Sequence, residues 1–195
     1  MQRGYNPYKN SLLVIIHEWG VQLVMCAAIV LNRGAEYNSL YRSYSSGPFQ
    51  EKFAGNTQLG FAYWDPHPLL PVRKKDEIVL FDWGHRDGDR NLPKTGWARL
   101  ESLSQNAWDR YNPIVVRIPA HYGCEKKVWF AVQGDIRGIL IREGNYSCVY
   151  MITQEATEAY KALTKHARMP RFHDGPNSFS VISEPTYRNS VEKLV

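Results

Sequence analysis

Residues 128–152, VWFAVQGDIRGILIREGNYSCVYMI, decide the fold class of this chain. The stretch holds three short runs of β-branched and aromatic residues, at 128–132, 136–141 and 147–152, and this composition is typical of β-strands. Turn-forming residues separate the runs, and Gly134-Asp135 predicts a hairpin turn between the first two. The stretch therefore predicts strands that follow one another directly along the chain.

Runs of the same kind precede this stretch at 24–31, 78–83 and 114–118. A helix-compatible segment at 35–44 ends before Gly47-Pro48, which a helix does not cross easily. Strands in series with a helix late in the chain predict an α+β fold, with a mostly antiparallel, barrel-like β-sheet core and a few flanking helices. At 195 residues the chain has the length of one domain.

The late helix is predicted directly after the last of these strands. Thr153 is its expected N-cap and Pro170 its stop, with glutamates near the positive end of the helix dipole and lysines near the negative end. An apolar stripe extends from Ala156 to Leu163, and His166 falls three residues later on the same face. We therefore expect His166 on the inward face of the last helical turn.

Charge and cysteine content limit the partners and the compartment. The formal net charge is +5 and the isoelectric point is near 9.1, which favours a polyanionic partner, although many soluble domains of this size carry such a charge without binding nucleic acid. Three cysteines without a secretory signal predict free thiols in a reducing, cytoplasmic compartment. The spacing of cysteines and histidines predicts no metal site. The apolar stretch at 11–31 is interrupted by His17 and Glu18, which argues against a membrane span.

Three short blocks in the second half of the chain bring together the residue types of a catalytic site. They are WARLES at 97–102, IPAHYGCE at 118–125 and HARMP at 166–170, with Met25-Cys26 upstream and Trp83-Gly84 before the first block. In chain order these segments supply a thiol, a carboxylic acid and an imidazole.

In this combination and order the blocks resemble the SOS response-associated peptidase (SRAP) family, whose members process abasic sites in DNA. The resemblance covers roughly residues 25–170 and implies a single SRAP-like domain at 25–195, preceded by an N-terminal extension at 1–24. It implies single-stranded DNA containing abasic sites as the partner. It also implies that no cofactor is needed, and a cytoplasmic location that is nucleoid-associated if the protein is cellular.

The resemblance implies that Cys26 is the nucleophile, exposed as the first residue once the initiating methionine is removed. An abasic site opens to an aldehyde, with which the α-amine of such a cysteine forms an imine and its thiolate closes a thiazolidine ring. An internal cysteine cannot do this because its nitrogen is an amide. Since Met25-Cys26 lies inside the given chain, three explanations are open: translation starts at Met25, the first 25 residues are removed, or the protein is a diverged member that does not crosslink.

Glu125 and His166 are the other two catalytic residues that the resemblance implies. Glu125 aligns with the family's active-site glutamate, although residues 121–124 depart from the usual Asp-Gly-Phe-Tyr. His166 begins the family's His-x-Arg-Met-Pro block, and an imidazole that titrates near neutrality can donate or accept a proton. The residues alone also allow plainer interpretations: Glu125 as a solvated carboxylate beside two lysines, and His166 as a packed, hydrogen-bonded core residue.

Three residues are expected to contact DNA. Arg99 resembles a phosphate ligand of the family and Arg168 a second basic contact, since a guanidinium offers paired donors to phosphate. Both could instead form structural ion pairs, Arg99 with Glu101 for instance. Trp97 stands where the family has Asn, and it could stack on an unpaired base or pack in the core.

The sequence thus predicts an abasic-site sensor that links covalently to single-stranded DNA, with possible autoproteolytic or peptidase activity. Two alternatives stay open. One is a diverged, non-catalytic nucleic-acid-binding module, and the other is a cysteine hydrolase that uses Cys26, His166 and Glu125. The sequence assigns no role to the last 25 residues.

Overall fold

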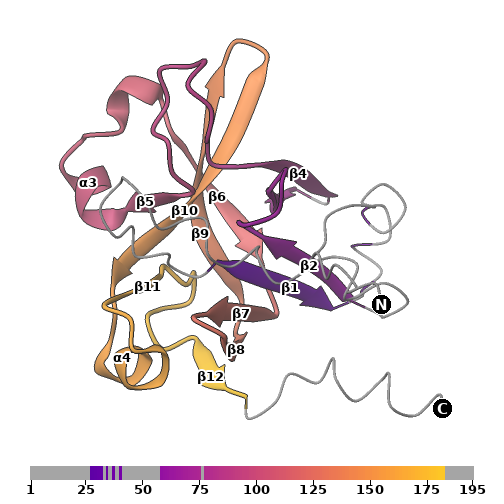
Figure 1. The fold of residues 1–195 in the computed structure, drawn as a ribbon, viewed down its shortest axis with the longest axis vertical. Coiled ribbons are helices and arrows are strands. Elements are labelled where there is room, and N and C mark those ends of the chain that lie inside the picture. The colour runs from indigo at the N-terminus through magenta and orange to yellow at the C-terminus, as the bar shows by residue number, and fades with distance from the viewer. Residues whose placement is uncertain are drawn as a thin grey trace, which may run out of the picture.

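The computed structural model describes residues 27–32, 34, 37, 40, 58–75 and 77–182 (Figure 1). The expected nucleophile Cys26 and the N-terminal extension at 1–24 lie outside these residues, as does nearly all of the helix predicted at 35–44. The described part of the chain contains all the other residues that the sequence analysis singled out as site residues.

Five strands form an antiparallel sheet in the order β12-β8-β7-β1-β2. These strands are β1 (Ala28–Asn32), β2 (Gln58–Ala62), β7 (Tyr122–Glu125), β8 (Val128–Val132) and β12 (Phe179–Val181). Because β1 pairs with β7, the first described residues of the chain lie beside a strand that comes about a hundred residues later.

The other seven strands form a second sheet in the order β11-β10-β4-β3-β6-β9, with β5 beside β10. Its strands are β3 (Leu69–Lys74), β4 (Glu77–Trp83), β5 (Trp97–Arg99), β6 (Ile114–Pro119), β9 (Asp135–Glu143), β10 (Tyr146–Glu155) and β11 (Arg168–Pro170). Since β9 also pairs with β10, the strands β10, β4, β3, β6 and β9 close into a five-strand barrel. The pairs of β10 with β4 and with β5 are parallel, and all the others are antiparallel.

Short helices flank this strand core. The described residues contain α3 (Leu100–Ser104), the 3-10 helix η2 (Asp109–Tyr111) and α4 (Glu158–Thr164). None of the helices in the described ranges has both the length and the apolar character needed to cross a lipid bilayer. The predicted α+β class, with a barrel-like and mostly antiparallel sheet, is confirmed.

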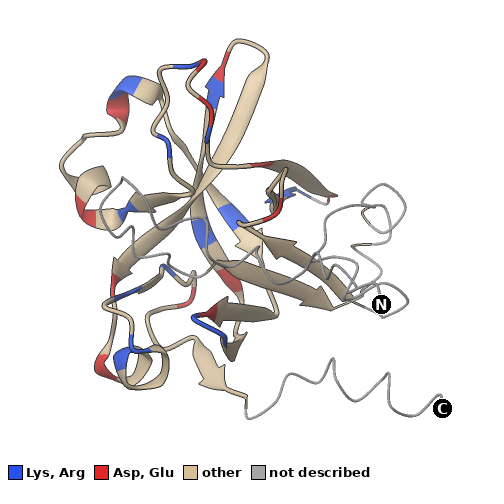
Figure 2. Cartoon of the chain, viewed as in Figure 1, with Lys and Arg blue, Asp and Glu red and all other residues tan. Residues whose placement is uncertain are grey.

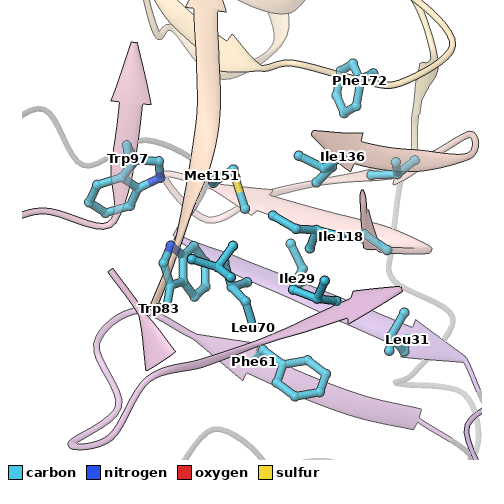
Figure 3. Close-up of a cluster of buried hydrophobic side chains, with 14 of the residues drawn as sticks. Ile29, Leu31, Phe61, Leu70, Trp83, Trp97, Ile118, Ile136, Met151 and Phe172 are labelled. Atoms are coloured by element: carbon cyan, nitrogen blue, oxygen red, sulfur yellow. The ribbon is translucent and has the colours of Figure 1, made fainter. Parts of the chain in front are cut away.

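The main hydrophobic core joins the two sheets. Ile29 and Phe61 from the five-stranded sheet pack in one cluster with Leu70 and Ile118 from the barrel, and all four are fully buried (Figure 3). Burying one such side chain stabilises the fold by about 1.5–3 kcal/mol. A second cluster lies on the other face of the barrel, where Trp108 of the segment before η2 packs against strands β9 and β10.

The predicted start of the late helix was wrong. Residues 153–155 continue strand β10, where Thr153 pairs with Pro170 and Glu155 with Arg168 of β11. Helix α4 begins at Glu158, and its N-cap is Thr157, whose hydroxyl accepts a hydrogen bond from the backbone N–H of Tyr160 at 3.3 Å. Pairing with β11 satisfies the backbone of residues 153–155, which outweighs the local preference of Thr153 for a helix start.

The predicted hairpin at Gly134-Asp135 was also wrong. The strands on either side of it, β8 and β9, belong to different sheets and do not pair with each other. Gly134 has a φ of +86°, and a Cβ at this position would lie 2.1 Å from an oxygen of Asp174. Glycine is therefore needed where the chain crosses from one sheet to the other.

Candidate active site

The hairpin between β7 and β8 sets the position of Glu125. Glu125 pairs with Val128, and the two lysines between them have φ values of +47° and +70°. Two-residue turns with positive φ at both positions suit the twist of a hairpin, but they usually contain Asn and Gly because other side chains are strained there. Lys126 and Lys127 therefore occupy a strained turn immediately after Glu125.

The Glu125 side chain is buried, with only 1 % of the residue exposed. Strand β1 lies alongside, since Ala28 pairs with Cys124 and the N–H of Ala27 donates to the Cys124 carbonyl at 3.0 Å. This burial excludes the interpretation of Glu125 as a solvated loop carboxylate. A buried carboxyl beside the start of β1 can exchange protons with a group that enters at this point.

His166 lies after helix α4, not in its last turn as predicted. Lys165 ends the helix in the left-handed conformation with a φ of +55°, and the next residue turns back toward β11. The imidazole is buried, and its Nδ1 lies 2.9 Å from the Arg168 carbonyl oxygen. The backbone N–H of Arg168 also lies 3.1 Å from Nδ1 and donates to it, so contacts with Arg168 hold the ring through this nitrogen in either tautomer.

Burial lowers the pKa of His166, and the charges of Lys126 and Arg168 lower it further, while the hydrogen bond to Arg168 raises it. The imidazole is therefore neutral at pH 7. Its Nε2 is buried and has no hydrogen-bond partner among the described residues. A neutral imidazole is the form that accepts a proton.

A direct contact ties the two expected catalytic segments together. The Nζ of Lys126, which follows Glu125, donates to the carbonyl of Lys165, which precedes His166, at 3.1 Å. Glu125 at the end of β7 and His166 between α4 and β11 thus belong to segments in contact, although they lie 41 positions apart in the sequence. Of the two, Glu125 comes from the strand that pairs with the start of β1.

The guanidinium of Arg168 is engaged in a structural ion pair. It donates to both carboxylate oxygens of Glu101, at 2.9 and 2.8 Å, and to the Thr153 carbonyl at 2.9 Å. The same hydrogen bonds lower the pKa of Glu101. Arg99 is exposed at the start of α3, and among the described residues it forms no ion pair. Glu101 thus forms an ion pair, but with Arg168 and not with Arg99.

Trp97 is a core residue, with 6 % of it exposed. Its ring packs against Tyr63, with ring centroids 4.4 Å apart, and lies 6.1 Å from the ring of Trp83 (Figure 3). Of the two roles considered for Trp97, core packing therefore holds, because no face of the ring is exposed enough to stack on a base.

Tyr63 lies beside Ala27, with Trp64 next to it in the chain and Arg86 over its ring, and no sequence pattern predicted a role for these three residues. The Tyr63 N–H donates to the Ala27 carbonyl at 2.8 Å, and the Arg86 guanidinium lies 4.3 Å from the centre of the Tyr63 ring. Trp64 is 51 % exposed, and exposed aromatic rings can stack on unpaired bases. The sequence feature that could have indicated a site here is the pair of adjacent aromatic residues, Tyr63 and Trp64, in a turn between two strands.

Two of the three cysteines are poor nucleophiles. Cys124 and Cys148 are buried, and burial raises the pKa of each thiol to about 11. Both therefore stay protonated at neutral pH, and a thiol is far less reactive than a thiolate. The described residues also contain no group of three or more side chains that could hold a metal ion.

The chain is similar in structure to a protein from Bacteroides thetaiotaomicron, a structural genomics target whose crystal structure is known. The two have a TM-score of 0.52 and 13 % sequence identity, over 87 % of this chain and 82 % of the other. No protein-family model matches the chain, and no curated protein matches it either. At this low identity the similarity concerns the fold alone.

Proposed function

We propose that this protein is an SRAP-like abasic-site sensor that links covalently to single-stranded DNA through Cys26. The observation that supports the proposal is the burial of two proton-transfer groups, Glu125 on the strand that pairs with the start of β1, and His166 in the segment that Lys126 contacts. Ala27 is fixed there by hydrogen bonds to Cys124 and from Tyr63. Cys26 is joined to Ala27 by one peptide bond, which keeps their Cα atoms about 3.8 Å apart.

The reaction needs Cys26 as the first residue. Its α-amine attacks the aldehyde carbon of the opened abasic site, and the resulting carbinolamine loses one water to give an imine. The thiol then adds to the imine carbon, which forms a carbon–sulfur bond, and its proton passes to the nitrogen. The product is a thiazolidine ring, and the net change is the loss of one water.

Glu125 and His166 move protons in these steps. Glu125 delivers a proton to the departing hydroxyl, and the neutral imidazole of His166 accepts one from the attacking amine or thiol. Phosphate binding is the role of Arg99, which is exposed, because Arg168 already holds Glu101 and Thr153. Trp64 is the side chain suited to contact a base next to the lesion.

One alternative has support from a specific observation. Trp97 replaces the family's asparagine and is buried, so this position supplies no amide donor to the site. This favours a module that binds nucleic acid without forming a covalent link. The other alternative, a cysteine hydrolase that uses Cys26, His166 and Glu125, keeps Cys26 as its nucleophile, because the raised pKa of Cys124 and Cys148 makes these two thiols unreactive.

The test uses protein that begins at Met25 and is processed to expose Cys26, mixed with single-stranded DNA that holds one abasic site. We expect an adduct that survives denaturing electrophoresis. Cys26→Ser keeps the amine and loses the thiol, so its adduct should appear only after borohydride reduction of the imine. Cys148→Ala is the matched control and should crosslink normally, because its thiol is buried and protonated.

Glu125→Gln in the same assay should slow adduct formation by about 10²–10⁴-fold, the usual contribution of a positioned acid or base. DNA binding should be unchanged in this variant. An equal yield of adduct from Cys26→Ala would contradict the covalent function. Normal DNA binding without any adduct from the processed wild-type protein would support the non-catalytic module.

A further inference from the structure

Four arginines lie in a row across adjacent segments of the barrel. Arg73 of β3 pairs with Arg117 of β6, which pairs in turn with Arg137 of β9. The N–H of Arg137 donates to the carbonyl of Arg171, in the segment after β11, at 2.8 Å. We call these four residues the arginine row.

The row lies on the outer face of the barrel. Neighbouring residues of a strand point to opposite faces, so Arg117 and Arg137 point away from Ile118 and Ile136, which pair with each other and are fully buried in the main core. Side chains of the row reach solvent, with 50 % of the Arg117 side chain and 30 % of the Arg73 side chain exposed. Figure 2 shows basic positions on neighbouring strands of this sheet.

Positive charge is in excess along the row. Its carboxylate partner among the described residues is Asp135, which accepts from Arg117 at 2.9 Å and from Arg73 at 3.4 Å. Arg171 donates to the neutral amide of Gln154. Arg137 has a buried Nε without a hydrogen-bond partner among the described residues. Among the described residues, the four guanidinium groups of the row thus form ion pairs with one carboxylate, which contacts two of them.

A cavity of about 230 Å³ opens at the Arg73 end of the row. Arg73, Asp135 and His121 contribute to its lining. It is smaller than the pockets of about 300–1,000 Å³ that hold drug-sized ligands, and it has room for a group such as a phosphate. The row and the cavity thus form one continuous polar surface.

We propose that the arginine row binds the sugar–phosphate backbone of a single nucleic-acid strand, at a surface that contains none of the candidate catalytic residues. Strands lie about 4.8 Å apart, so the row extends over roughly 14 Å. A single small anion would engage one or two guanidinium groups, whereas a polymer with regularly spaced phosphates can engage all four. Arginine suits this task because its planar fork donates two parallel hydrogen bonds to one phosphate. This surface goes beyond the proposed crosslinking, since it needs no lesion in the DNA.

The test measures binding of the full-length protein to a fluorescently labelled 20-nucleotide oligothymidine without abasic sites, over a series of salt concentrations. For single strands the slope of log K against log salt changes by about 0.7 for each phosphate contact. Arg117→Gln combined with Arg137→Gln should therefore reduce the slope by about 1.4. Arg142→Gln is the matched control, because Arg142 is exposed on β9 but points to the opposite face, and it should leave the slope unchanged.

Wild-type protein gives a second measurement that does not depend on the folding of a variant. Bound oligothymidine should protect Arg117 and Arg137, but not Arg142, from an arginine-modifying dicarbonyl, as quantified by mass spectrometry. An unchanged slope in the folded double variant, or equal modification with and without DNA, would overturn the proposal. The proposal would also be overturned if the double variant lost binding to anionic lipid vesicles but kept its DNA binding. The row would then be a membrane-binding surface.

Binding and crosslinking fail in distinguishable ways. When it is made to begin at Met25 and processed to expose Cys26, the double variant should still form the adduct at saturating DNA, and Cys26→Ser should keep the full salt slope. Loss of adduct in the Cys26 variant together with a normal slope supports both the row and the crosslinking function.

Discussion

His166 is held neutral by its surroundings, and this makes folding sensitive to acid. Its folded-state pKa lies below the ordinary value of about 6.5, so the folded protein binds fewer protons than the unfolded chain in mildly acidic solution. The stability that neutral His166 contributes is fully present above pH 6.5, and it is lost as the pH falls through the lowered pKa.

We expect the free energy of unfolding of the wild-type protein to fall between pH 7 and pH 5 by more than that of His166→Gln. Glutamine keeps hydrogen-bonding groups at this position but does not titrate. Urea denaturation of both proteins across this range measures the difference. If the free energy of unfolding changed equally with pH in both proteins, protonation of the buried imidazole would not destabilise the fold.

The surroundings of the candidate site residues could not be predicted from the sequence. The order of Glu125 and His166 and their chemical types are readable along the chain, whereas the burial of Glu125 is not, since two lysines follow it. Strand β1, which pairs with β7 beside Glu125, is distant in sequence. Likewise Arg168 pairs with Glu101 across 67 positions, so a local reading could only suggest the nearer Arg99.

At the scale of elements, the turn after Glu125 is strained because lysines occupy positions with positive φ, and one of them, Lys126, contacts the segment of His166. Non-glycine residues in the left-handed region cost on the order of 1–3 kcal/mol each. Lys127→Gly should therefore raise the free energy of unfolding by about 1 kcal/mol, because it relieves the φ of +70° and keeps the contact from Lys126 to Lys165.

Adding Lys126→Asn to Lys127→Gly should raise stability again but slow crosslinking, because the tie to the segment of His166 is lost. Lys75→Gly is the matched control: it relieves a φ of +51° at the distant end of β3 and should leave crosslinking unchanged. Thermal unfolding and adduct formation measured on the same samples test both effects. A slower reaction in Lys75→Gly would show that stabilisation by itself reduces activity.

The strands that sequence patterns predicted are the long, apolar ones. Residues 114–118, 128–132 and 136–141 all lie in strands because β-branched and aromatic runs fit a half-buried sheet. Strand β3 was missed because Pro71 interrupts it, and β7 because a glycine and a glutamate make up half of its four residues. Pairing with neighbours, not local preference, makes these segments strands.

At the scale of the whole molecule, closure of the barrel depends on Gly138. This residue lies in β9, where the strand pairs with both β6 and β10. A Cβ here would lie 2.8 Å from the Cδ1 of Ile118 and 3.1 Å from the Tyr150 carbonyl oxygen. Glycine in a strand interior marks such a close approach.

Gly138→Val should lower the free energy of unfolding by about 1–3 kcal/mol, the usual effect of overpacking. Ile118→Val removes the methyl group that lies closest and should recover part of the loss. Gly88→Ala is the matched control, since its nearest neighbour is the flexible end of Lys94. Denaturation of the three variants and the double variant tests the prediction, and a neutral Gly138→Val would show that the barrel can widen.

The pairing of β1 with β7 has a consequence during synthesis. Roughly a hundred residues separate Ala28 from its partner Cys124, so a ribosome that adds about 5–20 residues per second needs about 5–20 s to make the second strand after the first. Until then the hydrogen bond from Ala27 to Cys124 cannot form. Enzymes that trim nascent chains therefore have seconds to act on the segment carrying Met25-Cys26 before folding holds its neighbour in place.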